Sequence, residues 1–263
     1  MNAGLRIIHT ADAHGTSAVY DALTGNLNPE DDLLLDAGDT VQGSNTAFRW
    51  SEPNLRKLSQ LGCAAMTMGN RELHYLPWVL EQRASERTFP LLAANLVDLW
   101  GRPTTWQEGI SVERAGRRIG IFGMTVVQYP VGSLYERLFG LRFVPPHTLI
   151  EHLVRRYQEE HDLVIFLSHL GLAHDRALAR QIAAKPELKL DFLLGGHTHT
   201  TLEEPERYGR CRISHVGSHS QGYGIWSQPD MADWSYRFEP LSRLQGEAAT
   251  AFGTGQTTAE ALP

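Results

Sequence analysis

Seven side chains of types that bind metal ions follow five short apolar runs of the sequence. The runs cover residues 5–8, 33–35, 64–68, 163–167 and 192–194, and the side chains after them are Asp12, His14, Asp39, Asn70, His169, His197 and His199. If each run is a strand of a buried sheet, all seven side chains lie on loops at the carboxyl ends of strands, where open α/β sheets place their ligand sites. The pattern therefore predicts a metal site at a sheet edge.

Two of these loops carry ligand-type residues two positions apart, Asp12 with His14 and His197 with His199. In extended backbone, residues two apart point to the same side, so each pair can present both side chains to one ion. Carboxylate oxygen and imidazole nitrogen both bind zinc and other first-row metals. The spacing thus indicates two chelating loops.

Asp39, Asn70 and His169 complete the set. Asp39 follows Gly38 and has two oxygens that can bridge two cations, whereas Asn70 follows Gly69 and offers a neutral amide oxygen. Each residue alone is more typical of a turn, a helix cap or a satisfied polar side chain. The recurrence of ligand groups at five strand ends favours the metal centre.

Five ordered motifs around these residues resemble those of a known family. They read IHTADAHG at residues 8–15, LLDAGDTVQGS at 34–44, MGNRE at 68–72, SHLG at 168–171 and GGHTHT at 195–200. Together they are similar to the signature of the calcineurin-like metallophosphoesterases, and within that family to the catalytic domain of the 5′-nucleotidase and 2′,3′-cyclic phosphodiesterase branch. The similarity spans residues 5–228 and includes LLAANL at 91–96.

The resemblance implies both a fold and a metal centre. The fold is an α/β architecture of two mixed β-sheets packed face to face and flanked by helices, a four-layer αββα sandwich. Carried over position by position, Asp12, His14 and His199 hold a first ion, Asn70, His169 and His197 hold a second, and Asp39 bridges them. In such centres a hydroxide that bridges the two ions attacks phosphorus. Mixed nitrogen and oxygen ligands suit Mn²⁺, Fe, Zn²⁺ or Co²⁺, so the identity of the two divalent or trivalent ions stays open.

The chain departs from the family at Arg71, because the family usually has histidine after the Gly-Asn pair, where it contacts substrate and can protonate the leaving group. Arginine cannot act as a general acid near neutral pH, since its pKa exceeds ~12, but its guanidinium can bind a phosphoryl oxygen through two donors. Arg71 is therefore expected to stabilise charge without donating a proton. The absence of a proton donor would lower the rate ~100-fold or more on substrates whose leaving group must be protonated.

Two histidines are candidates for the missing acid. His74 lies three residues after Arg71, where the family pattern usually has aspartate, and His219 lies in a loop that in related proteins approaches the centre. The alternative for each is a packing or capping role. Arg71, His74 and His219 are thus the candidate catalytic residues.

These residues predict a metal-dependent phosphoesterase that hydrolyses phosphodiesters or activated phosphate esters. Two alternatives stay open: a nucleotidase-like phosphomonoesterase, and a protein that binds a phosphorylated ligand through its metals and Arg71 without turnover. The expected partner is a small phosphorylated substrate, with a nucleotide as one option.

Helices and strands that alternate along the chain must position these residues. Helices are expected at residues 51–61, 148–160 and 175–184, the first of them capped and begun by Ser51, Glu52 and Pro53. Residues 210–216, 222–227 and 233–238 are β-rich and separated by turn residues, which predicts an antiparallel run. Residues 1–240 are expected to form one catalytic domain, and residues 241–263, which are rich in Ala, Thr and Gly, a disordered tail.

The bulk composition argues against several classes of protein. A length of 263 residues with 42% hydrophobic content allows one substantial core, and a net charge of −6 argues against an extended nucleic-acid surface. No apolar run approaches the ~20 residues that cross a bilayer. The two cysteines, Cys63 and Cys211, lie too far apart to indicate a metal or redox motif. A cytoplasmic protein without a membrane partner is expected, and the oligomeric state stays unknown.

Overall fold

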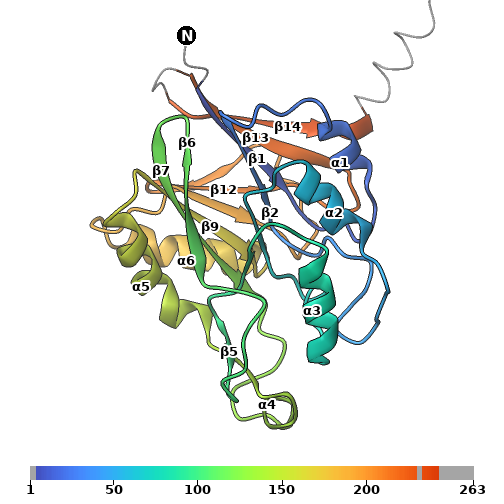
Figure 1. Ribbon diagram of the computed structural model, residues 1–263. Coiled ribbons are helices and arrows are strands. Elements are labelled where there is room, and N and C mark those ends of the chain that lie inside the picture. Colours follow the sequence, from blue (N-terminus) through green and yellow to red (C-terminus); the bar gives the residue numbers. More distant parts are fainter. Residues whose placement is uncertain (1–3, 230–232, 243–263) are drawn as a thin grey trace, which may run out of the picture.

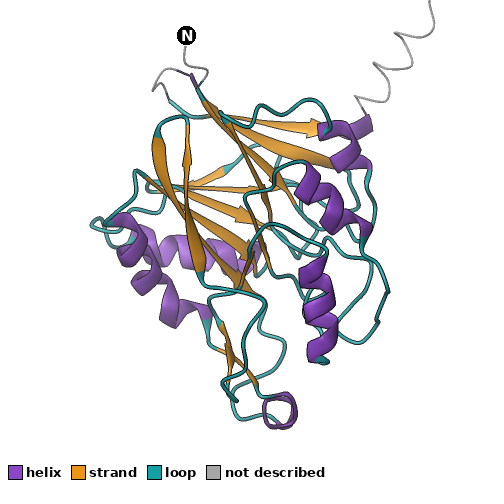
Figure 2. Ribbon diagram, viewed as in Figure 1, coloured by secondary structure: helices purple, strands orange, loops and turns teal. Residues whose placement is uncertain are grey.

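Continuous apolar runs form the central strands of two sheets, because strands covered on both faces need apolar side chains on both. The protein is described by a computed structural model that covers residues 4–229 and 233–242. Its two six-stranded sheets pack face to face, and helices lie on both outer sides of the pair (Figure 1, Figure 2). The predicted tail lies outside the described residues from residue 243 onward.

The first sheet combines a parallel part with two antiparallel strands at one edge. Its spatial order is β14 (Ser235–Pro240), β13 (Gly222–Gln228), β1 (Leu5–Thr10), β2 (Asp32–Asp36), β3 (Ala65–Thr67) and β4 (Leu91–Leu92). The pairs from β1 to β4 are parallel, whereas β13 is antiparallel to both β1 and β14.

The second sheet is parallel in its centre and antiparallel at both edges. Its spatial order is β11 (Glu206–Tyr208), β12 (Cys211–His215), β10 (Phe192–Gly195), β9 (Leu163–His169), β7 (Arg117–Thr125) and β6 (Gly109–Arg114). Strands β12, β10, β9 and β7 run parallel, and β11 and β6 are antiparallel to their neighbours.

Helices cover the outer faces, and a third apolar layer fills the space between the sheets. The helices are α1 (Ala18–Leu23), α2 (Pro53–Gln60), α3 (Pro77–Ser85), α4 (Leu134–Phe139), α5 (Pro146–Gln158) and α6 (Leu172–Ala183). Tyr20 of α1 and Leu55 of α2 pack with the outer face of the first sheet, and α5 and α6 pack on the second. Between the sheets, Leu35 of the first shares a buried cluster with Ile165 of the second. This confirms the predicted four-layer sandwich.

A small lobe stands apart from the two large sheets. It consists of the two-stranded sheet of β5 (Leu96–Asp98) and β8 (Leu141–Phe143), together with α4 (Figure 1). The ring of Phe139 at the end of α4 stacks on Tyr75, with 4.2 Å between the ring centroids. The lobe is thereby tied to the segment that follows Arg71.

Two expectations about individual elements were wrong. The segments predicted as one antiparallel run divide between the sheets: β12 pairs in parallel with β10, and only β13 and β14 form the expected hairpin. Local alternation reveals that a segment is a strand but not which strand it pairs with. Helix α6 begins at Leu172, three residues before the expected start, and the Asp175 carboxylate in its first turn is buried between Ser168 and His215. None of the helices in the described ranges has the length and apolar content that a membrane span requires.

Candidate metal centre

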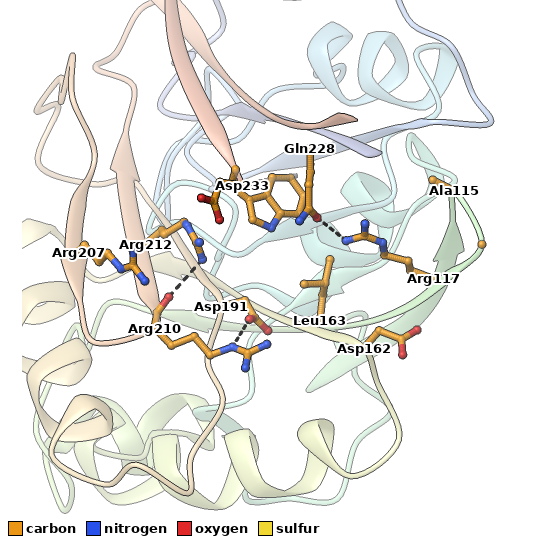
Figure 3. Close-up of a pocket in the computed structure, with 12 residues that line it drawn as sticks. Ala115, Arg117, Asp162, Leu163, Asp191, Arg207, Arg210, Arg212, Gln228 and Asp233 are labelled. Atoms are coloured by element: carbon orange, nitrogen blue, oxygen red, sulfur yellow. Dashed lines mark hydrogen bonds and ion pairs between the residues drawn. The ribbon is translucent and has the colours of Figure 1, made fainter. Parts of the chain in front are cut away.

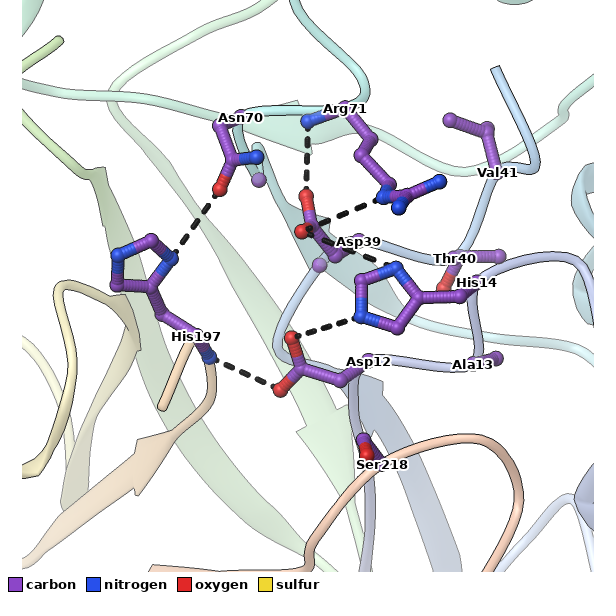
Figure 4. Close-up of polar contacts among 12 residues, drawn as sticks. Asp12, Ala13, His14, Asp39, Thr40, Val41, Asn70, Arg71, His197 and Ser218 are labelled. Carbon is purple, nitrogen blue, oxygen red and sulfur yellow. Dashed lines mark hydrogen bonds and ion pairs between the residues drawn. The ribbon is translucent and has the colours of Figure 1, made fainter. Parts of the chain in front are cut away.

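The five predicted loops meet at the carboxyl ends of strands from both sheets. Asp12, Asp39 and Asn70 follow β1, β2 and β3 of the first sheet, while His169 ends β9 and His197 follows β10 of the second. Figure 4 shows Asp12, Asp39, Asn70 and His197 pointing into one space. The edge that holds the site is therefore shared by two sheets and does not belong to one alone.

Backbone hydrogen bonds hold these loops against one another. The amide of Asp12 donates to the Gly38 carbonyl at 2.8 Å, and the amide of His14 donates to the Asp39 carbonyl at 2.9 Å. Across the two sheets, the amide of His197 donates to Asp12 Oδ2 at 2.9 Å. The positions of the loops are thus set by the main chain as well as by side chains.

Backbone conformation also singles out this site. Eight residues other than glycine have positive φ in the described ranges: Asp12, His14, Asp39, Ala115, His197, His199, His219 and Ser220. Side chains larger than hydrogen are disfavoured in that region, and such strain tends to accumulate at functional sites. Five of the eight are predicted ligands, and His219 and Ser220 lie on a neighbouring loop. Only Ala115 lies elsewhere.

Asp12, His14 and His199 come together as the first predicted ligand group. The Nε2 atoms of His14 and His199 are 2.8 Å apart, and Asp12 Oδ1 lies 3.8 Å from the former and 3.6 Å from the latter. These atoms surround a space of the size that one cation fills.

The second group meets the first at Asp39. Asn70 Oδ1 lies 3.1 Å from His197 Nδ1, and the rings of His169 and His197 are 5.1 Å apart. Asp39 Oδ1 is 3.5 Å from His169 Nε2, and its Oδ2 is 4.0 Å from His14 Nδ1. The Asp39 carboxylate thus faces a histidine of each group, His169 through Nε2 and His14 through Nδ1, and lies between the two groups.

The buried polar atoms of the site fit bound cations. Asp12 Oδ1, His14 Nδ1 and His169 Nε2 are buried and have no hydrogen-bond partner among the described residues. A buried polar atom lowers the stability of the fold unless a hydrogen-bond partner or a bound ion compensates it. The His169 ring is oriented by its Nδ1, which donates to the Ala37 carbonyl at 2.6 Å and leaves Nε2 directed at Asp39. A metal ion would satisfy Asp12 Oδ1 and His169 Nε2, whereas His14 Nδ1 faces the Asp39 carboxylate.

The pKa values of these side chains also fit a site that binds cations. Burial lowers the pKa of His14 and of His197 to about 4, so both imidazoles are neutral at pH 7 and can offer a lone pair. Burial raises the pKa of Asp12 to about 7. Burial opposes charge on Asp39 and His169 too, yet their mutual attraction lowers the pKa of Asp39 and raises that of His169. The carboxylates therefore require positive charge beside them.

Glu72 is a structural residue of the site that the sequence did not single out. Its buried carboxylate accepts hydrogen bonds from the amides of Gly69, Asp39, Thr40 and Val41, at 2.8 to 3.1 Å. It thereby joins the loop of Asp39 to the loop of Asn70. No spacing pattern in the sequence distinguishes this carboxylate from an exposed one.

The three candidate catalytic residues lie in different places. The Arg71 amide donates to Asp39 Oδ1 at 2.8 Å, and its guanidinium lies 4.0 Å from Asp39 Oδ2 and donates to the Gln42 carbonyl at 3.2 Å (Figure 4). His219 lies beside His14, with 4.7 Å between the ring centroids. Both therefore border the ligand groups.

His74 points elsewhere. It is buried, its Nδ1 accepts from the Leu76 amide at 3.1 Å just before α3, and it lines a cavity of about 220 Å³ with Tyr75 and Trp106. No hydrogen bond or ion pair joins it to a predicted ligand within the described ranges. This placement favours the packing role that was the alternative for His74.

A larger cavity, of about 600 Å³, lies at the opposite ends of the strands (Figure 3). Its wall includes Arg210, which donates to Asp191 Oδ1 at 2.5 Å, and Arg117, which donates to Gln228 Oε1 at 2.5 Å. No imidazole or thiol lines it. Among the described residues, the clusters of His and Asp side chains that could hold a metal ion lie at the end of the sheets where β1, β2 and β9 finish.

Comparison with known proteins identifies the family of this chain. The profile of the calcineurin-like phosphoesterase family matches residues 5–201. An uncharacterized metallophosphoesterase of Bacillus subtilis, YunD, is 27% identical over 78% of this chain and 45% of its own length. A 5′-nucleotidase of Vibrio cholerae is 26% identical over 74% of this chain and 40% of its own length. The chain thus spans less than half the length of these curated relatives.

Solved structures share the fold. A putative 5′-nucleotidase of Staphylococcus aureus aligns with a TM-score of 0.71 at 16% identity, over 90% of this chain and 54% of the other. The calcineurin-like phosphoesterase YfkN of B. subtilis aligns with a TM-score of 0.66 at 16% identity, over 91% of both chains. With the family profile covering most of the described residues, the chain belongs to the calcineurin-like phosphoesterase family.

Proposed function

We propose that this protein is a dinuclear-metal-dependent phosphohydrolase that acts on phosphodiesters or on phosphate esters with good leaving groups. The observation that carries the proposal is the convergence of seven ligand-type side chains, several with buried unpartnered atoms, beside the guanidinium of Arg71. Relatives that are named 5′-nucleotidases support phosphate ester chemistry and make a small nucleotide one substrate candidate.

In this proposal the ligand groups divide as the family resemblance implies. Asp12, His14 and His199 would hold one ion, Asn70, His169 and His197 the other, and Asp39 both. Bound divalent cations supply charge neutralisation at the phosphoryl oxygens and lower the pKa of water to ~7. The side chain of Arg71 binds a phosphoryl oxygen, and Glu72 holds the Asp39 and Asn70 loops at a fixed separation.

Two other functions compete with this one. A nucleotidase-like phosphomonoesterase would share the ligands but would need a proton donor for poor leaving groups, which Arg71 cannot be. A binding protein for a phosphorylated ligand would use the same cations and Arg71 without turnover. The complete set of ligand types favours an enzyme over a binding protein, and Arg71 favours good leaving groups.

Activity assays separate these three functions. With Mn²⁺, the protein is expected to hydrolyse nitrophenyl phosphodiesters and monoesters and to leave alkyl monoesters nearly untouched, and a chelator is expected to stop turnover. Equal rates on alkyl and nitrophenyl monoesters would support the phosphomonoesterase instead. Tight, metal-dependent binding of inorganic phosphate without hydrolysis of any ester would support the binding protein.

The division of ligands leads to a second expectation, about individual metal sites. His14→Ala and His199→Ala should weaken one ion preferentially, whereas His169→Ala and His197→Ala should weaken the other, because each ion loses one of its own imidazoles. Anomalous diffraction from crystals of the four variants locates the peak that is lost. His147→Ala, which changes an exposed histidine on α5, is the matched control and should keep both peaks. Loss of the same peak in all four variants would refute the division.

A further inference from the structure

A third imidazole lies beside the two that would hold the first ion. The candidate ligand atoms of His14, His199 and His219 all lie within 4.8 Å of one another. The His219 ring is 4.7 Å from the His14 ring and 5.7 Å from the His199 ring, measured between centroids. In a tetrahedral site with metal–nitrogen distances of ~2.1 Å, two imidazole nitrogens are ~3.4 Å apart. Side-chain movements of about 1–1.5 Å would therefore place all three nitrogens on one ion.

The loop that carries His219 is fastened to the site on both sides. The His219 amide donates to the Asp12 carbonyl at 2.8 Å, and the hydroxyls of Ser220 and Thr16 are 2.9 Å apart. The His219 Nδ1 atom lies 2.9 Å from Ser218 Oγ, which leaves Nε2 as the free nitrogen. Figure 4 shows Ser218 on this loop, next to Asp12. His219 and Ser220 both have positive φ, as His14 and His199 do.

We propose that His219 Nε2 is an additional ligand of the first metal ion, alongside Asp12, His14, His199 and the bridging Asp39. The inference rests on the proposed dinuclear centre and specifies one of its two sites. It makes the centre asymmetric, since the first site has three imidazoles whereas the second has two imidazoles and an amide oxygen. Nitrogen-rich sites favour Zn²⁺, Fe and Co²⁺ over Mn²⁺, so the first site selects these borderline metals more strongly than the second.

A metal-bound His219 is not the general acid of the reaction. Its Nε2 lone pair is occupied by the ion, and its Nδ1 is turned to Ser218. The inference therefore leaves Arg71 as the cationic group that faces the substrate, with no protonated imidazole beside it.

Metal titration tests this inference without an activity assay. Zn²⁺ affinities of wild type and His219→Ala are measured by competition with a chromophoric chelator, and the visible absorption of the Co²⁺ forms reports the coordination of each ion. We expect His219→Ala to lose at least about tenfold in Zn²⁺ affinity at one site only, to change the Co²⁺ spectrum, and to lose less in Mn²⁺ affinity. His147→Ala should match wild type in all three measurements.

The outcomes separate this inference from the proposed function. If wild type binds two ions and His219→Ala keeps both Zn²⁺ affinities and the Co²⁺ spectrum, the extra ligand is wrong and the dinuclear centre stands. If wild type itself binds fewer than two ions at saturation, both proposals fail. Thermal unfolding of the metal-free variants shows whether a loss of affinity reflects a loss of fold. His219→Gln keeps a polar ligand atom, so its Zn²⁺ affinity should fall between those of wild type and His219→Ala.

Discussion

Replacing Asp39 by alanine is expected to remove both metal ions and to reduce turnover by several orders of magnitude, because the reaction depends on metal-bound water and on charge neutralisation by the ions. Asp39 is the one carboxylate that faces a histidine of each ligand group, with Oδ1 at 3.5 Å from His169 Nε2 and Oδ2 at 4.0 Å from His14 Nδ1. Its loss leaves both sites one ligand short and removes negative charge between them. Metal content by mass spectrometry and hydrolysis of a nitrophenyl phosphodiester measure the two effects.

Asp21→Ala is the matched control for that variant. Asp21 is an exposed carboxylate on α1 that pairs with Lys57, away from the ligand loops. It should keep two ions and full activity. Circular dichroism should show the same secondary structure in both variants, because the Asp39 side chain contributes to the site and not to an apolar core cluster. Full loading and wild-type turnover in Asp39→Ala would overturn the proposed centre.

Changing Arg71 is expected to alter how the rate depends on the leaving group. In wild type the rate should rise steeply as the leaving-group pKa falls, because the guanidinium binds phosphoryl oxygen but does not protonate the departing alcohol. Arg71→His introduces a group that titrates near ~6.5 and can act as an acid, so it should flatten this dependence. A series of substituted phenyl esters measures the slope in each protein.

Arg71→Ala should slow every ester in the series by a similar factor. A lost charge-assisted contact in the transition state is worth ~2–4 kcal/mol, which corresponds to roughly 30- to 1,000-fold in rate. Arg56→Ala, which changes an exposed arginine of α2 paired with Glu86, should leave the rates unchanged. A flat profile in wild type that becomes steep only when His74 or His219 is changed would identify that histidine as the acid.

Local sequence patterns predicted the ligand loops but not the sheet to which each belongs. The apolar runs before Asp12, Asp39, Asn70, His169 and His197 are strands, and each strand ends within two residues of the end of its run, with His169 itself as the last residue of β9. The family resemblance implied two sheets but not which runs each contains, because a run of apolar residues carries no information about its partner strand. The misplacement of β12 has the same cause.

The three candidate catalytic residues show a second limit of sequence reasoning. His219 is more than 200 residues from His14, yet its loop reaches the site because β13 is antiparallel to β1, so that the start of β13 lies at the carboxyl end of β1. His74 is three residues from Arg71, yet it lines a different cavity. Distance along the chain predicts neither outcome, whereas strand direction explains the position of His219. Glu72 was missed because a carboxylate that binds only backbone amides has no spacing signature.

The residues with positive φ that gather at one end of the sheets place backbone strain at the site itself. A non-glycine residue in that conformation costs ~1–2 kcal/mol relative to relaxed backbone, and glycine would avoid most of the cost. Seven of the eight such residues in the described ranges are predicted ligands or lie on the His219 loop. Glycine at these positions would relieve this local strain, but it would also remove the side chains that bind. The strained backbone is therefore part of presenting these ligands at one end of the sheets.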